Sequence, residues 1–129
     1  MIVLDASVVV DLLLRNDSAA IEARVLSDGE SLHAPHLLDV EVAHVLRRFS
    51  QGNEVSATRA QQAMVHLLDL PIQRYGHEAF LPRIWALRFN LTAYDATYVA
   101  LAEGLGAPLL TRDRKLSSTP GHAAAIDVV

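Results

Sequence analysis

The chain has 129 residues, a length that suits one domain over residues 1–129 with a single core. It contains no cysteine, which excludes disulfides, thiolate zinc sites and cysteine nucleophiles. No apolar run approaches the roughly 20 residues of a membrane span. The net charge of −4, from 15 acidic and 11 basic residues, differs from that of most nucleic-acid-binding proteins, which are basic.

The first segment, MIVLDASVVVDLLLR, is apolar enough to resemble a secretory signal peptide. It lacks a basic leading region, and Asp5 and Asp11 interrupt it, so we reject that interpretation and expect a cytoplasmic location. Ile2–Leu4 is predicted to be a buried strand, and Ser7 is predicted to cap a helix over about Val8–Leu14.

Helical and strand patterns alternate along the rest of the chain. Pro35 is expected to open a helix, because proline suits an early helical position, and Gly104 is expected to close another. The alternation predicts an α/β fold with a mostly parallel central sheet of four to five strands and helices on both faces. The expected elements, in order, are helix Ala19–Leu26, strand Ser31–Ala34, helix His36–Phe49, a helix capped by Ser56, strand Pro71–Tyr75, helix Pro82–Phe89, a helix from Thr92 through Ala102, and strands Pro108–Thr111 and Ala125–Val128.

Two acids follow predicted strands closely. Asp5 comes directly after Ile2–Leu4, and Asp113 comes two residues after Thr111 at the end of the fourth strand. In open parallel sheets, ligands bind outside the carboxyl ends of the strands. We therefore expect both acids at the same edge of the sheet.

Two further acids lie on helices. Glu41 shares its helical face with apolar residues at i−4, i−3 and i+4, and a carboxylate on such a face is costly to bury unless it is paired or binds a metal. Asp95 lies in the first turn of its helix, where the run from Thr92 to Asp95 matches a capping box in its Asp form.

Convergence of Asp5, Glu41, Asp95 and Asp113 would place like charges close together, and each pair ~5 Å apart repels by roughly 3 kcal/mol at an effective dielectric of 20. A hard cation with oxygen ligands offsets that repulsion, and Mg²⁺ or Mn²⁺ suits such carboxylates. The resulting site suits phosphodiester hydrolysis, since the metal lowers the pKa of a bound water. Setting these four acids aside leaves 11 acidic residues against 11 basic ones, a balance compatible with RNA binding.

Polar neighbours extend this hypothesis. Ser7 and Thr111 are predicted to orient carboxylates or waters. Three basic residues that flank Asp113 are candidates for contacts with RNA phosphates: Arg112, Arg114 and Lys115.

Each of these residues also has a purely structural interpretation. The aspartates can cap helices or form turns, Glu41 can pair with an arginine, and the three basic residues can belong to a solvated loop. His44 is interpreted as a helix-surface residue. Trp85 and Phe89 share a helical face and are interpreted as core residues rather than as a base-stacking platform.

Three motifs in this order resemble the PIN-domain ribonucleases, and specifically the VapC-type toxins of bacterial toxin–antitoxin pairs. They are IVLDASV with Asp5 and Ser7, LLDVEVAHVL around Glu41, and LTAYDATYVALAEGLGAPLLTRDRKL with Asp95, Thr111 and Asp113. The resemblance runs from residue 1 to about residue 118. Each motif alone is weak, but together, in a chain of this length, they are highly specific.

The resemblance implies a PIN fold and a Mg²⁺- or Mn²⁺-dependent endoribonuclease. It assigns Asp5, Glu41, Asp95 and Asp113 to the acidic quartet, with Ser7 and Thr111 as accompanying hydroxyls. It also implies a homodimer, a VapB-type antitoxin whose tail blocks the acidic groove, and structured RNA substrates such as tRNA or ribosomal RNA. Some PIN proteins carry a further acid just after the last motif, where this chain has Leu116, which argues against tight binding of a second metal ion.

Two other functions compete with this one. A phosphatase that uses Asp5 as a nucleophile would normally carry a second Asp two residues later, where this chain has Ser7, and its required lysine would have to be Lys115. A catalytically silent RNA- or protein-binding module on a PIN scaffold would be favoured by loss of the acids, yet all four are present.

Overall fold

The computed structural model describes all residues, 1–129. Five strands and seven α-helices alternate along the chain, with one short 3-10 helix. The elements are β1 (Ile2–Leu4), α1 (Ala6–Leu14), α2 (Ala19–Val25), β2 (Leu32–Pro35), α3 (Leu37–Gln51), α4 (Ala57–Asp69), β3 (Ile72–Tyr75), η1 (Glu78–Phe80), α5 (Leu81–Ala86), α6 (Ala93–Leu105), β4 (Leu109–Thr111), α7 (Arg114–Ser118) and β5 (Ile126–Val128).

The five strands form one entirely parallel sheet in the order β3-β2-β1-β4-β5. β1 is the central strand, and its three apolar residues are all buried, as expected for a strand covered on both faces. Leu4, its last residue, pairs in register with Leu110 of β4. β1 and β4 therefore end at one common edge of the sheet.

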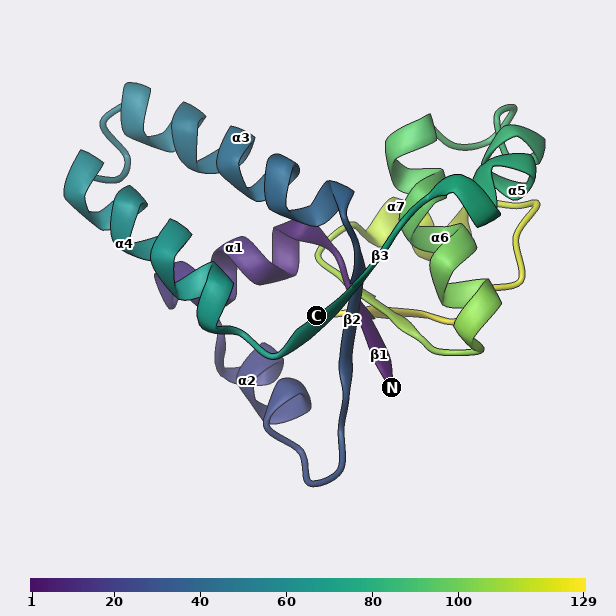
Figure 1. The fold of residues 1–129 in the computed structure, drawn as a ribbon, viewed down its shortest axis with the longest axis horizontal. Helices are drawn as coiled ribbons and strands as arrows, with labels where there is room; N and C mark the ends of the chain where they lie inside the picture. Colours follow the sequence, from purple (N-terminus) through teal and green to yellow (C-terminus); the bar gives the residue numbers. More distant parts are fainter.

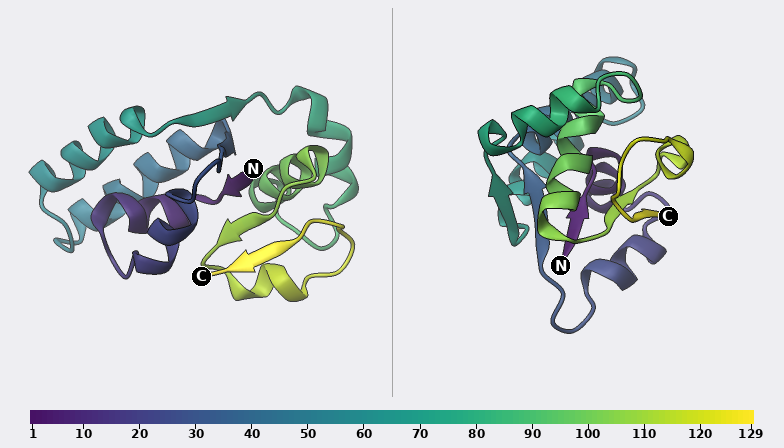
Figure 2. Two further views of the ribbon diagram at one scale, coloured as in Figure 1. Left: turned by 90° about the horizontal axis from the view of Figure 1, so that it is seen from below. Right: turned by 90° about the vertical axis from the view of Figure 1, so that its right-hand side faces the viewer.

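Helices cover both faces of the sheet, which confirms the predicted α/β architecture. Figure 1 shows α1 to α4 on one side of the strands and α5 and α6 on the other, and Figure 2 shows the same two groups from two further directions. α6 is the most buried helix, because the seven consecutive residues from Ala96 to Ala102 are all buried. No helix combines the length and the apolar character needed to cross a membrane.

Two predicted helix starts were wrong. Asp5, and not Ser7, caps α1, because its Oδ1 accepts a 2.8 Å hydrogen bond from the Ala6 N–H and the helix begins at Ala6. Pro35 is the last residue of β2 and does not open α3; it pairs in register with Tyr75, and the helix begins two residues later.

The predicted end of α6 was also wrong. The helix continues through Gly104 to Leu105, and Gly106, with a φ of 63°, provides the left-handed residue that ends it. Gly104 has a packing role instead: a Cβ at this position would lie 2.6 Å from the ring of Phe80.

Trp85 and Phe89 are not core residues. Their side chains are 68% and 82% exposed, because α5 ends at Ala86 and the buried residues of this segment are Ile84, Leu87 and Leu91. The periodicity that suggested a buried face does not hold beyond the end of the helix.

Candidate active site

The topology brings the four candidate acids to one groove at the carboxyl edge of the sheet. Asp5 follows β1 and Asp113 lies two residues beyond the end of β4, the neighbouring strand. Glu41 comes from the second turn of α3, and Asp95 from the first turn of α6. The groove is lined by Asp5, Ala6, Ser7, Val10, Asp11, Glu41, Val45, Arg48, Phe49, Asp95, Arg112 and Asp113.

Asp5 is fixed by three hydrogen bonds. Besides the Ala6 N–H on Oδ1, its Oδ2 accepts bonds from the hydroxyls of Ser7 (3.0 Å) and Thr111 (2.7 Å). Thr111 is fully buried, and its Oγ1 also accepts a 3.0 Å bond from the Asp113 N–H. The two hydroxyls that the sequence singled out therefore hold Asp5, and Thr111 also connects it to the backbone of Asp113.

Glu41 carries an oxygen without a partner. Its Oε1 is buried and makes no hydrogen bond, and the same is true of the buried hydroxyl of the neighbouring Tyr98. Burial raises the pKa of Glu41, and the charges of Asp5 and Asp95 raise it further, while the Tyr98 hydroxyl, which lies beside the carboxylate but outside hydrogen-bond geometry, lowers it. An ionised Glu41 at neutral pH is thus costly unless something positive or hydrogen-bonding reaches Oε1.

Asp95 shows the same combination of burial and repulsion. Burial raises its pKa, and the charges of Asp5 and Asp113 add to that rise. Its backbone N–H donates to the Thr92 hydroxyl at 3.1 Å, which is one half of the predicted capping box; the reciprocal bond from the Thr92 N–H to the Asp95 carboxylate is not formed, although Thr92 lowers the pKa of Asp95. The carboxylate therefore remains available to a ligand in the groove.

The basic residues beside Asp113 separate into two groups. The Arg112 guanidinium donates to Asp11 Oδ2 at 2.8 Å and also to the backbone oxygens of Asn16 and Asp17, so this side chain is already engaged by the protein. Arg114 and Lys115 are exposed at the start of α7, and their side chains make no ion pair. The predicted phosphate contact at Arg112 therefore competes with an internal ion pair, whereas the other two are free.

Comparisons with known proteins decide the family. The PIN domain model matches residues 2–121, nearly the whole chain. The chain belongs to the PIN-domain family. Ribonuclease VapC12 of Mycobacterium tuberculosis is 43% identical over 129 residues, which cover all of this chain and 99% of that protein. This confirms the resemblance to VapC proteins.

Solved structures show the same PIN-domain fold. PAE2754 from Pyrobaculum aerophilum is 26% identical, with a TM-score of 0.73 over 98% of this chain and 83% of that one. VapBC2 from Rickettsia felis, solved with a DNA fragment from its promoter, is 14% identical, with a TM-score of 0.71 over 99% of this chain and 98% of that one. The second likeness concerns the fold alone.

One residue of this PIN domain's groove, Arg48, and one buried neighbour of Glu41, Tyr98, were missed from the sequence. Arg48 lies seven residues after Glu41, two helical turns along the same face of α3, and a helical projection would have placed it in the groove. Tyr98 lies three residues after Asp95, on the same side of α6, but nothing in its local pattern separates it from the buried residues around it. No three His, Asp or Glu side chains of the PIN domain have the spacing of a metal-binding cluster in this structure.

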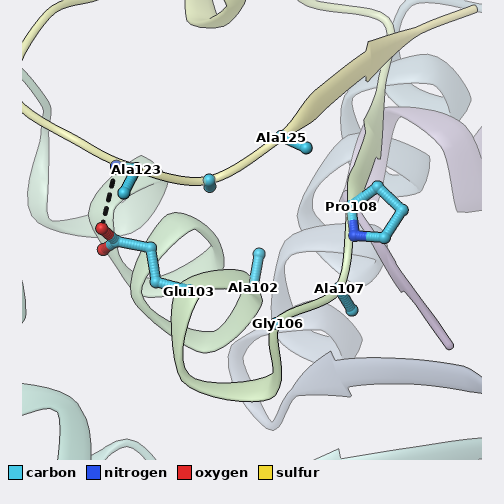
Figure 3. Close-up of a pocket in the computed structure, with 8 residues that line it drawn as sticks. Ala102, Glu103, Gly106, Ala107, Pro108, Ala123 and Ala125 are labelled. Carbon is cyan, nitrogen blue, oxygen red and sulfur yellow. Dashed lines mark hydrogen bonds between the residues drawn. The ribbon is translucent and has the colours of Figure 1, made fainter.

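A second hollow of the PIN domain, between α6 and the segment before β5, lacks such chemistry. Figure 3 shows that it is lined mainly by alanines, with Glu103 as its single charged residue. That carboxylate is occupied, because Arg83 donates to both of its oxygens at 2.9 Å and the Ala123 N–H donates to Oε2 at 3.0 Å. The acidic groove is therefore the better candidate for the active site.

Proposed function

We propose that the chain is a metal-dependent endoribonuclease that acts as the toxin of a VapBC-type toxin–antitoxin pair. Family membership supports a nuclease, and the matched relative VapC12 is named a ribonuclease. The observation that carries the proposal is the partnerless Oε1 of Glu41 in a groove that four other carboxylates also line, of which only Asp11 is paired with an arginine.

The chemistry of the donor set suits a hard divalent cation, although no three of these carboxylates lie at metal-binding spacing in this structure, so binding would have to draw them together. Asp5, Glu41, Asp95 and Asp113 offer only carboxylate oxygens, the ligands that Mg²⁺ and Mn²⁺ prefer. A cation beside Glu41 Oε1 would offset both the burial of that oxygen and the repulsion that raises the pKa of Glu41 and of Asp95. We assign the metal site to these four acids.

Other residues in and beside the groove have distinct tasks in this proposal. Ser7 and Thr111 keep Asp5 in one orientation, because both hydroxyls donate to the same oxygen. Arg48, Arg114 and Lys115 would bind phosphates on either side of the scissile bond. When bound, the ion supplies a water of lowered pKa and neutralises charge that develops on the phosphate.

Partners follow from the family in the same way. We propose structured RNA, such as tRNA or ribosomal RNA, as the substrate, and a VapB-type antitoxin whose tail occupies the acidic groove. We also propose a homodimer, since an apolar fraction of 51% is at the high end for a globular domain and leaves apolar surface for a subunit contact. Light scattering of the purified chain would give its mass directly.

The deciding experiment is cleavage of total cellular RNA by purified, antitoxin-free protein with Mg²⁺, Mn²⁺ or EDTA, beside the variant Asp95→Ala. We expect discrete fragments that require metal and disappear in the variant. Absence of cleavage by folded protein under all conditions would refute the nuclease and favour the silent binding module. Hydrolysis of a phosphomonoester without cleavage of RNA would favour the phosphatase.

A further inference from the structure

Two large aromatic side chains project from the end of α5 and from the connection between α5 and α6. Trp85 is 68% exposed and Phe89 is 82% exposed, although aromatic rings of this size are usually largely buried. The backbone beneath them is anchored, because Ile84, Leu87 and Leu91 are buried in the core. The two rings are therefore held at the surface by a well-packed segment.

A single cation joins the two rings. The guanidinium carbon of Arg88 lies 4.7 Å from the Trp85 ring centre and 4.4 Å from the Phe89 ring centre, within the range of cation–π contacts. Arg88 Nη1 donates to the Trp85 carbonyl oxygen at 2.9 Å, and no carboxylate pairs with this arginine. The three side chains form one aromatic and positively charged surface, which we call the Trp85–Phe89 patch.

The Trp85–Phe89 patch lies near the acidic groove. Six residues separate Phe89 from Asp95, so their Cα atoms are at most about 22 Å apart. In Figure 1 the α5–α6 connection leads directly into the start of α6, the helix that carries Asp95 in its first turn. A few nucleotides of single strand would span this interval.

We propose that the Trp85–Phe89 patch binds an unpaired base of the RNA substrate by stacking, with Arg88 beside the neighbouring phosphate. This inference rests on the proposed ribonuclease function and assigns one of its substrate contacts. Every base has a flat π-face that stacks on aromatic rings or on a guanidinium plane, and its phosphate is attracted to the arginine. A paired duplex does not offer such a face, so the patch selects single-stranded loops or bulges.

Trp85 is the only tryptophan, so its fluorescence reports on the patch directly. The measurement uses Asp95→Asn protein, which does not need to cut RNA, titrated with a short single-stranded oligoribonucleotide and with the same sequence in a duplex. We expect the single strand to quench Trp85 and the duplex to do so much less. Unchanged fluorescence at saturating single-stranded RNA would overturn the proposal.

Substitutions in the Trp85–Phe89 patch test whether its aromatic rings bind RNA by stacking. We expect Phe89→Ala and Trp85→Ala to weaken binding of the single strand roughly 5- to 150-fold, the range for one lost base–aromatic stack, and Phe89→Tyr to retain it. Leu68→Ala is the matched control, because Leu68 is 76% exposed on α4, remote from α5 in sequence.

Two further results would overturn the proposal while leaving the nuclease intact. One is metal-dependent RNA cleavage that is unchanged, in rate and in cleavage positions, when Trp85 and Phe89 are both replaced by alanine. The other is a fall in molecular mass of that double variant with unchanged RNA affinity, which would assign the patch to a contact between two copies of the chain. Quenching by RNA in a protein that cuts no RNA would support the patch and refute the nuclease.

Discussion

Thr111 donates a 2.7 Å hydrogen bond to Oδ2 of Asp5, although the two residues lie 106 positions apart in the chain. β4 and β1 are neighbours in the sheet, so the last residue of one strand meets the first residue beyond the other. The same hydroxyl accepts the Asp113 N–H at 3.0 Å. One buried side chain therefore sets the positions of two of the four candidate metal ligands.

Thr111→Val tests this arrangement, because valine keeps the shape and removes the hydroxyl. We expect the free energy of unfolding to fall by about 1–3 kcal/mol, since the variant loses a bond to a charged group and leaves the partly buried Asp113 N–H without its partner. RNA cleavage should fall more than tenfold. Urea denaturation and cleavage rates measure the two effects, with Thr111→Ser as the control that keeps the hydroxyl. Full activity of the valine variant would contradict a positioning role.

Asp95→Asn should stabilise the metal-free protein at neutral pH. The pKa of Asp95 is raised above its ordinary value of 3.8 by burial and by Asp5 and Asp113, so the folded chain holds this proton more tightly than the unfolded chain. The resulting penalty is fully present above the raised folded pKa and is lost as the pH falls below the unfolded value. We expect a melting temperature a few degrees higher than that of the unmodified chain in EDTA at pH 8, and little difference at pH 3.5.

The exposed Asp28 provides the control for this measurement. Asp28→Asn removes the same charge from the chain without touching the groove, so its melting temperature should follow that of the unmodified chain at both pH values. A lower melting temperature for Asp95→Asn in EDTA at pH 8 would show that the acids do not repel one another in the folded protein.

The central sheet and the acidic residues at its edge were predicted well from the sequence, because short apolar runs and the acids that follow or interrupt them are local features. β1 was predicted to the residue, since three consecutive apolar residues end at an aspartate. The topology then follows from alternating strands and helices, and it brings Asp5 and Asp113 to neighbouring strand ends. Glu41 stood out because it interrupts an apolar face, and the structure places it on the same groove.

Features that depend on competing local partners were not predictable. Asp5 and Ser7 are both good capping residues, and only the structure shows that the serine hydroxyl instead donates to Asp5 and accepts the Arg112 N–H from just beyond β4. Gly104 was predicted to end α6, but the left-handed residue that ends it is Gly106, whereas Gly104 lies where a Cβ would meet the ring of Phe80, a residue distant in sequence. The ion pair of Arg112 with Asp11 joins α1 to the end of β4 and has no sequence signature.

Arg112 should contribute to the stability of the protein, and Arg114 to the binding of RNA. Arg112 donates to Asp11 and to the backbone oxygens of Asn16 and Asp17, in a loop where Asp17 has a φ of 45°, a conformation that costs about 1 kcal/mol or more outside glycine. We expect Arg112→Ala to lower the free energy of unfolding by about 1–3 kcal/mol. Arg114→Ala should leave stability unchanged and weaken RNA binding. Urea denaturation and RNA titration of both variants check this, and equal stability of the two would contradict the distinction.

Arg48 and Arg47 offer a test of the electrostatics of the groove. Both lie near the end of α3 and both are exposed, but only Arg48 lines the groove. A phosphate contact releases counterions, so each one adds about 0.7 to the slope of log affinity against log salt concentration for a single strand. We therefore expect Arg48→Ala to weaken RNA binding at low salt and to lower this slope by about 0.7, while Arg47→Ala leaves the slope unchanged. Titrations of both variants on an Asp95→Asn background, from 50 to 200 mM salt, measure it. Equal slopes for the two would mean that RNA does not reach the α3 side of the groove, and the path of the strand would then run from Asp113 toward Arg114 and Lys115 alone.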